Sequence, residues 1–367
     1  MPAKVEIREM KRSSFLKGLL SVSALSLFGE RSARAASPSV IRIGVPSVGV
    51  GDRPKSGGSP PSTVGLQGLL EEEFKADGIK VQWSYLRGAG PAVNELFANG
   101  LVDFGFGLGD LPSIIGRAGG LPTRVLLAGG IRQNSYISVP ADSSVNGVKD
   151  LRGKKVAIFK GTNIQLAVQR ILEANGLTEK ELRSINMNTA STKAALVTRD
   201  VDAAFGGSDY LALRDQGVTK VVFTTRGGDP GFLRHSSVVG AQSFIDQYPQ
   251  ATQRVVSVIV KAAKWLSDHD ANPTPVFQLW TKSGVQFSNY KEDFQASSLK
   301  VRSSPLIDEY LTSQYKRAIR DAKRFGLIKN EFSFDSWVEP RFLKEALRAQ
   351  GLENFWTPHG PDGKPKA

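Results

Sequence analysis

A strand, a tight turn and a helix between residues 150 and 176 constrain the fold of this chain more than any other segment. A short apolar run ends before Gly161, and apolar residues then recur at helical spacing after Thr162, which predicts a β-strand followed by a capped helix. The first N–H groups of such a helix lack internal acceptors, and its dipole is positive at that end. The turn Lys160 to Asn163 is therefore a candidate anion site, although Thr caps many helices that bind nothing.

The same alternation of β-runs and helical patterns continues along the chain. We expect strands at 40–45, 79–86, 102–106, 125–128, 135–139, 154–159, 185–188, 203–205, 218–225 and 237–240. We expect helices at 64–75, 92–99, from about 112, after 162, and at 190–199, 248–269, 275–283, 293–300, 308–325 and 341–350, with a frayed tail at 358–367. This order predicts an α/β protein with mainly parallel sheets flanked by helices. Ligands of such sheets bind at the carboxyl ends of the strands, where the Gly-rich turns of this chain fall.

The composition excludes several classes of function. Cysteine is absent, which rules out disulfides, thiolate metal sites and cysteine nucleophiles. The net charge of +13 is scattered and not gathered into a basic arm, so we expect no nucleic-acid binding and favour a small anionic ligand. His235, His269 and His359 lack metal-ligand spacing, and the glycines at 105, 107 and 109 lack the spacing of a dinucleotide fingerprint. We therefore expect no metal and no cofactor.

Residues 1–35 have the features of a secretory signal peptide. A basic stretch precedes the apolar run 18–28, and a small-x-small motif ends at Ala35, which predicts cleavage after Ala35 and a periplasmic protein. The run is shorter than the about 20 residues of a membrane-spanning helix. Ser13 occupies the place of the second arginine of a twin-arginine signal, which favours the general secretory route. Met10 is an alternative start of the chain.

Four groups of residues carry a resemblance to a known family: 98–105, 148–157 with Gly161-Thr162, 194–196 with 201–204, and 244–265. With these segments the chain resembles the periplasmic solute-binding proteins of ABC importers, in the branch that binds aliphatic sulfonates, taurine and nitrate. The resemblance covers about residues 40 to 350. The chain departs from the family at Gly206-Gly207, where a proline is common, and in a longer loop at 46–61.

The resemblance implies a two-lobed, type II periplasmic-binding-protein fold, in which each lobe is a mainly parallel sheet flanked by helices. Lobe one would comprise residues 36–132 and 240–367 and lobe two residues 133–239, joined by crossings near 131–135 and 238–241. The implied function is the capture of a small organic anion between hinged lobes. A monomer would then present its closed form to an ABC permease in the inner membrane.

The expected ligand-binding residues lie at strand ends that face the cleft between the lobes. They are Arg87, Gly88, Ala89, Gly90, Gly109, Asp110, Lys160, Gly161, Thr162, Asn163, Gly207, Ser208 and Asp209. A guanidinium holds a sulfonate or carboxylate through two parallel hydrogen bonds. The cations near strand ends or crossings are Arg87, Arg132, Lys160, Arg226 and Arg234, and for each of them, taken alone, a solvated surface charge is the favoured interpretation.

Two other functions remain open from the sequence. The first is a binder of an uncharged heterocycle or vitamin precursor, with aromatic side chains as a stacking surface: Trp83, Tyr85, Tyr136 or Tyr210. Aromatic residues more often fill cores. The second is a hydrolase built on His235 with Asp229 and Ser236, since the desulfinases that resemble this fold use a cysteine that this chain lacks. We expect no catalytic residues.

Overall fold

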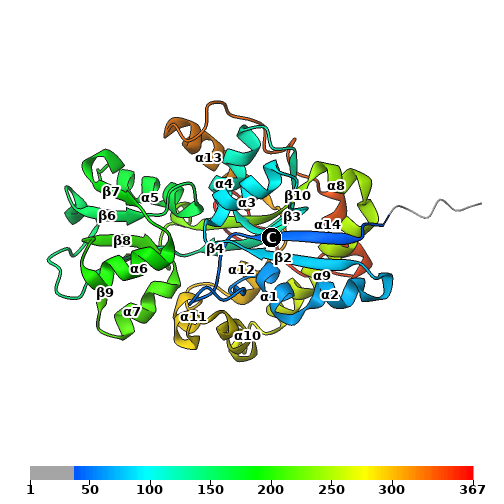
Figure 1. Cartoon of the computed structure of the whole chain (residues 1–367), viewed down its shortest axis with the longest axis horizontal. Helices are drawn as coiled ribbons and strands as arrows, with labels where there is room; N and C mark the ends of the chain where they lie inside the picture. Colours follow the sequence, from blue (N-terminus) through cyan, green and yellow to red (C-terminus); the bar gives the residue numbers. More distant parts are fainter. Residues whose placement is uncertain (1–36, 367) are drawn as a thin grey trace, which may run out of the picture. The chain divides into compact units, whose positions relative to one another are not determined.

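The computed structural model describes residues 37–366. The predicted signal peptide and its cleavage site therefore lie outside the described residues. Two five-stranded sheets, each flanked by helices, form the described part of the chain (Figure 1). Within that part, no helix is both long enough and apolar enough to cross a bilayer.

The first sheet contains β1 (Val40–Val45), β2 (Lys80–Tyr85), β3 (Phe104–Gly109), β4 (Thr123–Gln133) and β10 (Arg234–Ala241). Their order across the sheet is β2-β1-β3-β10-β4. β1 runs parallel to β2 and β3, whereas β10 runs antiparallel to β3 and β4. The strand predicted at 40–45 has the bounds of β1.

The second sheet contains β5 (Tyr136–Pro140), β6 (Lys155–Ile158), β7 (Arg183–Asn186), β8 (Ala203–Gly206) and β9 (Thr219–Thr224). Its order is β7-β6-β8-β5-β9, with β6 parallel to β7 and β8, and β5 antiparallel to β8 and β9. The second sheet thus repeats the pattern of the first. Both sheets are mixed, so the expectation of mainly parallel sheets holds only for the pairings around β1 and β6.

One strand belongs to a different sheet from the one expected. The sequence predicts the run at 237–240 in the second lobe, with the return crossing near 238–241. In the structure it is part of β10, which pairs with β3 and β4 of the first sheet. The chain therefore returns to the first sheet between β9 and β10. The apolar pattern of a strand identifies a buried strand but carries no information about its neighbours.

The helices of the first half are α1 (Pro60–Gln67), α2 (Leu69–Phe74), α3 (Ala89–Ala98), α4 (Asp110–Ala118), α5 (Asn163–Ala174), α6 (Thr189–Thr198) and α7 (Leu211–Asp215). Those of the second half are α8 (Gln242–Gln247), α9 (Pro249–Asp268), α10 (Thr274–Trp280), α11 (Phe287–Asp293), α12 (Leu299–Arg302), α13 (Glu309–Arg324) and α14 (Arg341–Ala349).

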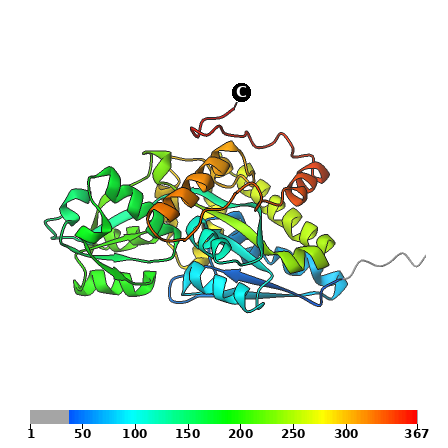
Figure 2. The ribbon, with the colours of Figure 1, turned by 90° about the horizontal axis from the view of Figure 1, so that it is seen from above.

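Helices cover both faces of the first sheet. Successive residues of a strand point to opposite faces, and accordingly Val238 belongs to an apolar cluster with α1, α2, α9 and α14, whereas Val239 belongs to another with α3, α4 and α13. Figure 2 shows α9 and α14, drawn yellow-green and red, in the half of the described chain that contains the first sheet. In the second sheet, α5 packs with Ile137 and Phe205, and α6 packs with Ala204.

Three expectations for secondary structure were wrong. The helix predicted at 64–75 is divided at Gly68, whose φ of 66° stops α1 and starts α2. The helix predicted at 293–300 is replaced by the end of α11, a turn, and α12 with Ser298 as its N-cap. The tail 358–366 is not frayed, although most of its residues are exposed: His359 is 7% exposed, and the Gly363 carbonyl accepts a hydrogen bond of 2.9 Å from Arg132.

A polar cleft as the candidate ligand site

A cleft of about 470 Å³ lies at the carboxyl ends of strands from both sheets. Gly109 and Gln133, the last residues of β3 and β4, line its wall. Thr162 in the turn before α5 and Gly207 in the turn after β8 line it as well. The loop between β1 and α1 lines much of the remaining wall. This volume is in the range of small-molecule sites, and the position at strand ends is the usual one in α/β proteins.

Arg234, the first residue of β10, is a half-buried cation in this cleft. Among the described residues its guanidinium donates hydrogen bonds only to neutral oxygens: Ser135 Oγ at 3.1 Å, Asn163 Oδ1 at 3.3 Å and the Asn134 carbonyl. Within residues 37–366, no carboxylate lies at ion-pair distance from it. Burial lowers the pKa of Arg234, against the opposing effects of Asp293 and Asp110. Its charge therefore lacks a bonded counter-ion in the described part of the chain.

The N-terminus of α5 adjoins this arginine. Thr162 is the predicted N-cap: its Oγ1 accepts from Ile164 N–H at 3.3 Å and donates to the Phe159 carbonyl at 2.7 Å. Asn163, the first helical residue, lines the cleft and presents its side-chain oxygen to Arg234. The dipole of this twelve-residue helix adds positive potential at the same place.

The turn before α5 lies close to the turns of the first sheet, as the sequence predicted. A Cβ placed on Gly161 would lie 2.9 Å from Pro91 Cγ, and one placed on Gly109 would lie 3.0 Å from Asn163 Cβ. Gly161 also has a φ of 76°, which a residue with a side chain adopts only with strain. Glycine at these two positions allows strand ends from different sheets to approach one another.

The other charged side chains of the cleft wall form ion pairs. Asp52 bonds Arg87 at 2.5 Å, Asp209 bonds Lys193 at 2.5 Å, and Asp293 bonds Arg302 at 2.8 Å. Together with Arg234 they are the seven charged residues that residues 37–366 contribute to the wall. The wall thus carries three carboxylates and four cations, which leaves one positive charge.

Asp293 is the most enclosed of these charges. Both it and Arg302 are nearly buried, with side-chain exposures of 7% and 6%. Asp293 also accepts hydrogen bonds from Tyr136 OH at 2.7 Å and Asn134 Nδ2 at 3.0 Å. Burial alone would raise the pKa of Asp293, but Arg302 and the hydrogen bonds outweigh it and hold the pKa below its ordinary value. This network connects the end of α11 to the chain just after β4.

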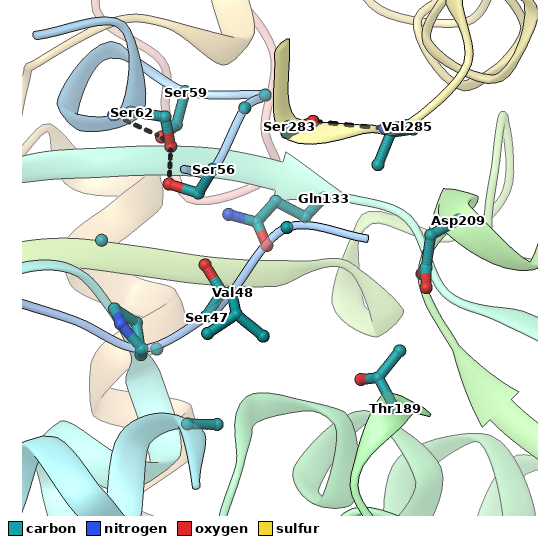
Figure 3. A pocket seen from close by; sticks show the side chains of 18 of the residues that line it. Ser47, Val48, Ser56, Ser59, Ser62, Gln133, Thr189, Asp209, Ser283 and Val285 are labelled. Atoms are coloured by element: carbon teal, nitrogen blue, oxygen red, sulfur yellow. Dashed lines mark hydrogen bonds between the residues drawn. The ribbon is translucent and has the colours of Figure 1, made fainter. Parts of the chain in front are cut away.

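Uncharged polar groups line the wall near the start of α1 (Figure 3). Ser56 Oγ contacts Ser62 Oγ at 3.0 Å, and Ser62 Oγ contacts Ser59 Oγ at 2.9 Å. We call these three residues the serine trio. Gln133 lies beside the trio, because a Cβ on Gly130 would lie 3.2 Å from both Gln133 Nε2 and Ser59 Cβ. Its Nε2 donates to the Gly130 carbonyl, which leaves Oε1 as the acceptor end of the amide.

Most of the predicted site residues line the cleft: Arg87, Ala89, Gly90, Gly109, Thr162, Asn163, Gly207, Ser208 and Asp209. Gly88, Asp110, Lys160 and Gly161 do not line it. Lys160 instead bonds Glu179 at 2.8 Å and Ser184, and Gly161 N–H donates to Gln165 Oε1. Asp110 is 3% exposed and accepts from Leu111 N–H at 2.7 Å, and burial raises its pKa to about 6.

Of the five candidate cations, Arg234 and Arg87 line the cleft. Arg132 stacks over the Tyr310 ring, with its guanidinium carbon 4.2 Å from the ring centroid. Arg226 bonds Glu292 at 2.9 Å. Arg87 is 67% exposed and paired with Asp52, so of the two cations that line the cleft Arg234 is the one that combines partial burial with the absence of a carboxylate partner in residues 37–366.

Sequence reasoning missed several residues of the wall, namely the serine trio, Gln133, Asn134, Lys193, Ser236, Asp293 and Arg302. The length and the Gly/Ser content of the loop at 46–61 were a signal for the serines, and that loop does line the cleft. Asp293 and Arg302 come from short helices far along the chain. No local pattern in the sequence associates them with the strand ends.

The geometry gives no support to a serine hydrolase. His235 and Ser236 are adjacent in β10 and point to opposite faces, and only Ser236 lines the cleft. His235 Nδ1 accepts from Arg132 N–H, and Ser236 Oγ donates to the Gly130 carbonyl. Burial and three neighbouring arginines lower the pKa of His235 to about 3. The described residues also contain no cluster of His, Asp and Glu that could hold a metal ion.

The aromatic residues proposed as a stacking surface lie elsewhere. Trp83 and Tyr85 stack on each other at 6.1 Å between ring centroids, and Tyr136 and Tyr210 are buried. None of these four lines the cleft in the described part of the chain. Its aromatic residues are Phe106, Phe159, Tyr290 and Phe294.

Known proteins with similar sequences and structures share the fold described above. A protein-family profile described as "NMT1/THI5 like" matches residues 74–272. The periplasmic sulfonate-binding protein SsuA from Methylobacillus flagellatus KT is 31% identical, with a TM-score of 0.73 over 88% of this chain and 98% of that chain. A Bacillus subtilis (strain 168) protein named for binding aliphatic sulfonates is 28% identical over 292 residues, which span 77% of this chain and 82% of that protein.

More distant structures share the fold. The alkanesulfonate-binding protein SsuA from Xanthomonas axonopodis pv. citri bound to MOPS is 18% identical, with a TM-score of 0.66 over 83% of this chain and all of that chain. The desulfurization enzyme DSZB is also 18% identical, with a TM-score of 0.62 over 84% of this chain and 99% of that chain. These likenesses confirm the predicted type II periplasmic-binding-protein fold. The chain belongs to the NMT1/THI5-like family of periplasmic solute-binding proteins.

Proposed function

We propose that this protein is the extracytoplasmic substrate-binding component of an ABC importer and captures a small organic anion, a sulfonate or a similar group, in the cleft. The observation that carries the proposal is Arg234, a half-buried guanidinium with neutral hydrogen-bond partners and no carboxylate at ion-pair distance within residues 37–366. A buried charge without a counter-ion is costly, and a bound anion supplies that counter-ion. Relatives named for sulfonate binding support the same ligand class.

Replacing Arg234 by Gln is expected to weaken binding of ethanesulfonate by about a hundredfold, since hydrogen bonds to a charged group contribute about 1.5–3 kcal/mol. The folded state should be as stable as the wild type or more so, because the substitution removes an uncompensated charge. Isothermal titration calorimetry measures the affinity, and thermal unfolding without ligand measures the stability.

Arg87→Gln is the matched control for that experiment. Arg87 also lines the cleft, but it is 67% exposed and paired with Asp52, so its loss should change the affinity by no more than about twofold. Equal losses in the two variants would contradict the role of Arg234. A wild-type protein that binds neither methanesulfonate nor ethanesulfonate, with no thermal shift at millimolar ligand, would contradict the proposed function itself.

In this proposal residues 36–132 and 240–367 form one lobe and residues 133–239 the other, with β10 (Arg234–Ala241) and the end of β4 (Thr123–Gln133) assigned to the first lobe because both strands pair in the first sheet. A ligand at Arg234 would contact residues from both lobes: Asn163 is the first residue of α5, and Ser236 lies in β10. Such a ligand stabilises the closed arrangement of the lobes through its differential affinity. In this proposal the closed form of the monomer is what the inner-membrane permease recognises.

We also propose that the mature protein begins at Ala36 in the periplasm. The motif that ends at Ala35 follows the apolar run at the spacing of a signal-peptidase site. N-terminal sequencing of protein recovered from the periplasmic fraction should give Ala36 as the first residue. A soluble cytoplasmic form that retains Met1 or Met10 would contradict this prediction.

A further inference from the structure

We propose that the cleft selects an organic anion with one negative charge and an uncharged, hydroxyl-bearing tail, and that it discriminates against a tail that ends in an ammonium group. This inference rests on the proposed function and specifies the substrate class of the same site. It follows from two features of the wall: the pairing of its charges and the hydrogen-bonding capacity of the serine trio with Gln133.

The charges of the wall match a ligand with one negative charge. Asp52, Asp209 and Asp293 each have a cation within 2.8 Å. Arg234 is the cation that remains when these pairs are removed from the seven charged residues of the wall. A second negative charge on the ligand would have to break one of the pairs to find a partner.

The same pairing disfavours a zwitterion. An ammonium group needs a carboxylate or several neutral acceptors when it leaves water. All three carboxylates of the wall are already bonded to Arg or Lys, so an ammonium tail would compete with a cation of the protein. A hydroxyl tail makes no such demand.

The serine trio has one more donor than it can use internally. Three hydroxyl protons serve two contacts, Ser56 with Ser62 and Ser62 with Ser59. The remaining proton has no acceptor among the hydrogen bonds of residues 37–366, and the trio faces the cleft (Figure 3). Ser59 also caps α1 by accepting from Ser62 N–H. The trio is therefore held in place by its own helix and presents a hydroxyl donor.

Gln133 supplies the complementary acceptor. Its Nε2 is committed to the Gly130 carbonyl and to Ser236 Oγ at 3.4 and 3.3 Å, which directs Oε1 away from them. A hydroxyl group both donates and accepts one hydrogen bond. A ligand hydroxyl between Gln133 and the trio would therefore satisfy both of its requirements. A methyl group there would leave the polar wall without a partner, and sites built to bind a hydroxyl reject analogues that lack it.

Three ligands of nearly equal size test this inference: 2-hydroxyethanesulfonate, 1-propanesulfonate and 2-aminoethanesulfonate. They share the sulfonate and differ only in a terminal OH, CH₃ or NH₃⁺. Calorimetric titration of the wild-type protein at pH 7 should show the hydroxy ligand binding about tenfold more tightly than the methyl ligand, and at least about tenfold more tightly than the amino ligand. Equal affinity for the hydroxy and methyl ligands, or tighter binding of the amino ligand, would overturn the inference.

Gln133→Met tests whether Gln133 distinguishes the hydroxy ligand from the methyl ligand, because the substitution removes the amide group and keeps the side chain at nearly the same length. We expect this variant to bind 1-propanesulfonate at least as well as the wild type and to lose most of its preference for the hydroxy ligand. If the variant keeps the preference for the hydroxy ligand, Gln133 does not recognise the tail of the ligand. Binding of 1-propanesulfonate to the wild type separates the two proposals: if it binds and the preference is absent, only this inference fails, and if no sulfonate binds, the proposed function fails.

Discussion

Asn163→Asp is expected to abolish anion binding while making the folded protein more stable. The side-chain oxygen of Asn163 lies 3.3 Å from Arg234 Nη1, so a carboxylate there becomes the internal counter-ion that Arg234 lacks. A bound sulfonate would then lie beside a fixed negative charge, and two unit charges about 4 Å apart repel by roughly 4 kcal/mol at an effective dielectric constant of 20, nearly a thousandfold in affinity.

The stability of Asn163→Asp should change in the opposite direction. A new ion pair with Arg234 and a carboxylate in the first turn of α5 both favour the folded state, together by about 1 kcal/mol. Calorimetric titration with ethanesulfonate and urea unfolding without ligand measure the two effects on the same protein. Loss of affinity together with loss of stability would indicate a damaged fold and not a neutralised arginine.

Asn188→Asp is the control for charge in the cleft. Asn188 also lines the wall and caps α6 by accepting from Ser191 N–H at 2.9 Å, a bond that Asp retains. It has no hydrogen bond to Arg234 among those of the described residues. This variant adds the same charge to the same cleft and should weaken binding far less. Equal losses in both variants would mean that the anion responds to the general potential of the cleft and not to Arg234.

Asp293→Asn is expected to produce the largest loss of stability, about 3–5 kcal/mol in the free energy of unfolding at pH 7, because it leaves Arg302 buried without its counter-ion. The pair is nearly enclosed, and its Nη1–Oδ2 distance is 2.8 Å. Urea unfolding followed by circular dichroism measures the loss. Asp335→Asn is the matched control: Asp335 is 66% exposed and paired with Lys316 at the surface, so it should cost no more than about 0.5 kcal/mol.

The double variant Asp293→Asn with Arg302→Met tests the cause of that loss. Removing both charges leaves no unpaired ion, so the double variant should be more stable than Asp293→Asn alone. Additive losses in the double variant would show that packing around α11 and α12 matters and that the ion pair does not.

The effect of Asp293 should also depend on pH in one direction. Its pKa is held below the ordinary value in the folded state, so its stabilising contribution is present in full above the unfolded pKa of about 4 and is lost as the pH falls through the folded pKa. The stability difference between the wild type and Asp293→Asn should therefore be constant near neutral pH and shrink in acid. A difference that grows as the pH falls would contradict the assigned pKa direction.

The sequence alone determined the local structure around the site. Thr162 is the N-cap that the pattern predicted, because capping depends on residues within one helical turn. The β-run at 40–45 is β1, and Gly109 and Gly161, which follow predicted strands, lie where segments of the two sheets approach closely. Hydrophobic periodicity and the residue preferences of turns are short-range properties, so they can be recognised without knowledge of the rest of the chain.

Only the tertiary structure decided which strands pair and which charges remain unpaired. The strand at 237–240 belongs to the first sheet because β10 lies between β3 and β4. The pairing of the sheet determines this position, and the residues of the strand alone do not. Arg234 differs from Arg87 and Arg226 because those two have carboxylate partners in the folded chain. The burial and the ion pairing of a side chain depend on residues distant in sequence, as the pair Asp293 and Arg302 illustrates. Burial and pairing together determine which of the many arginines is available to bind an anion.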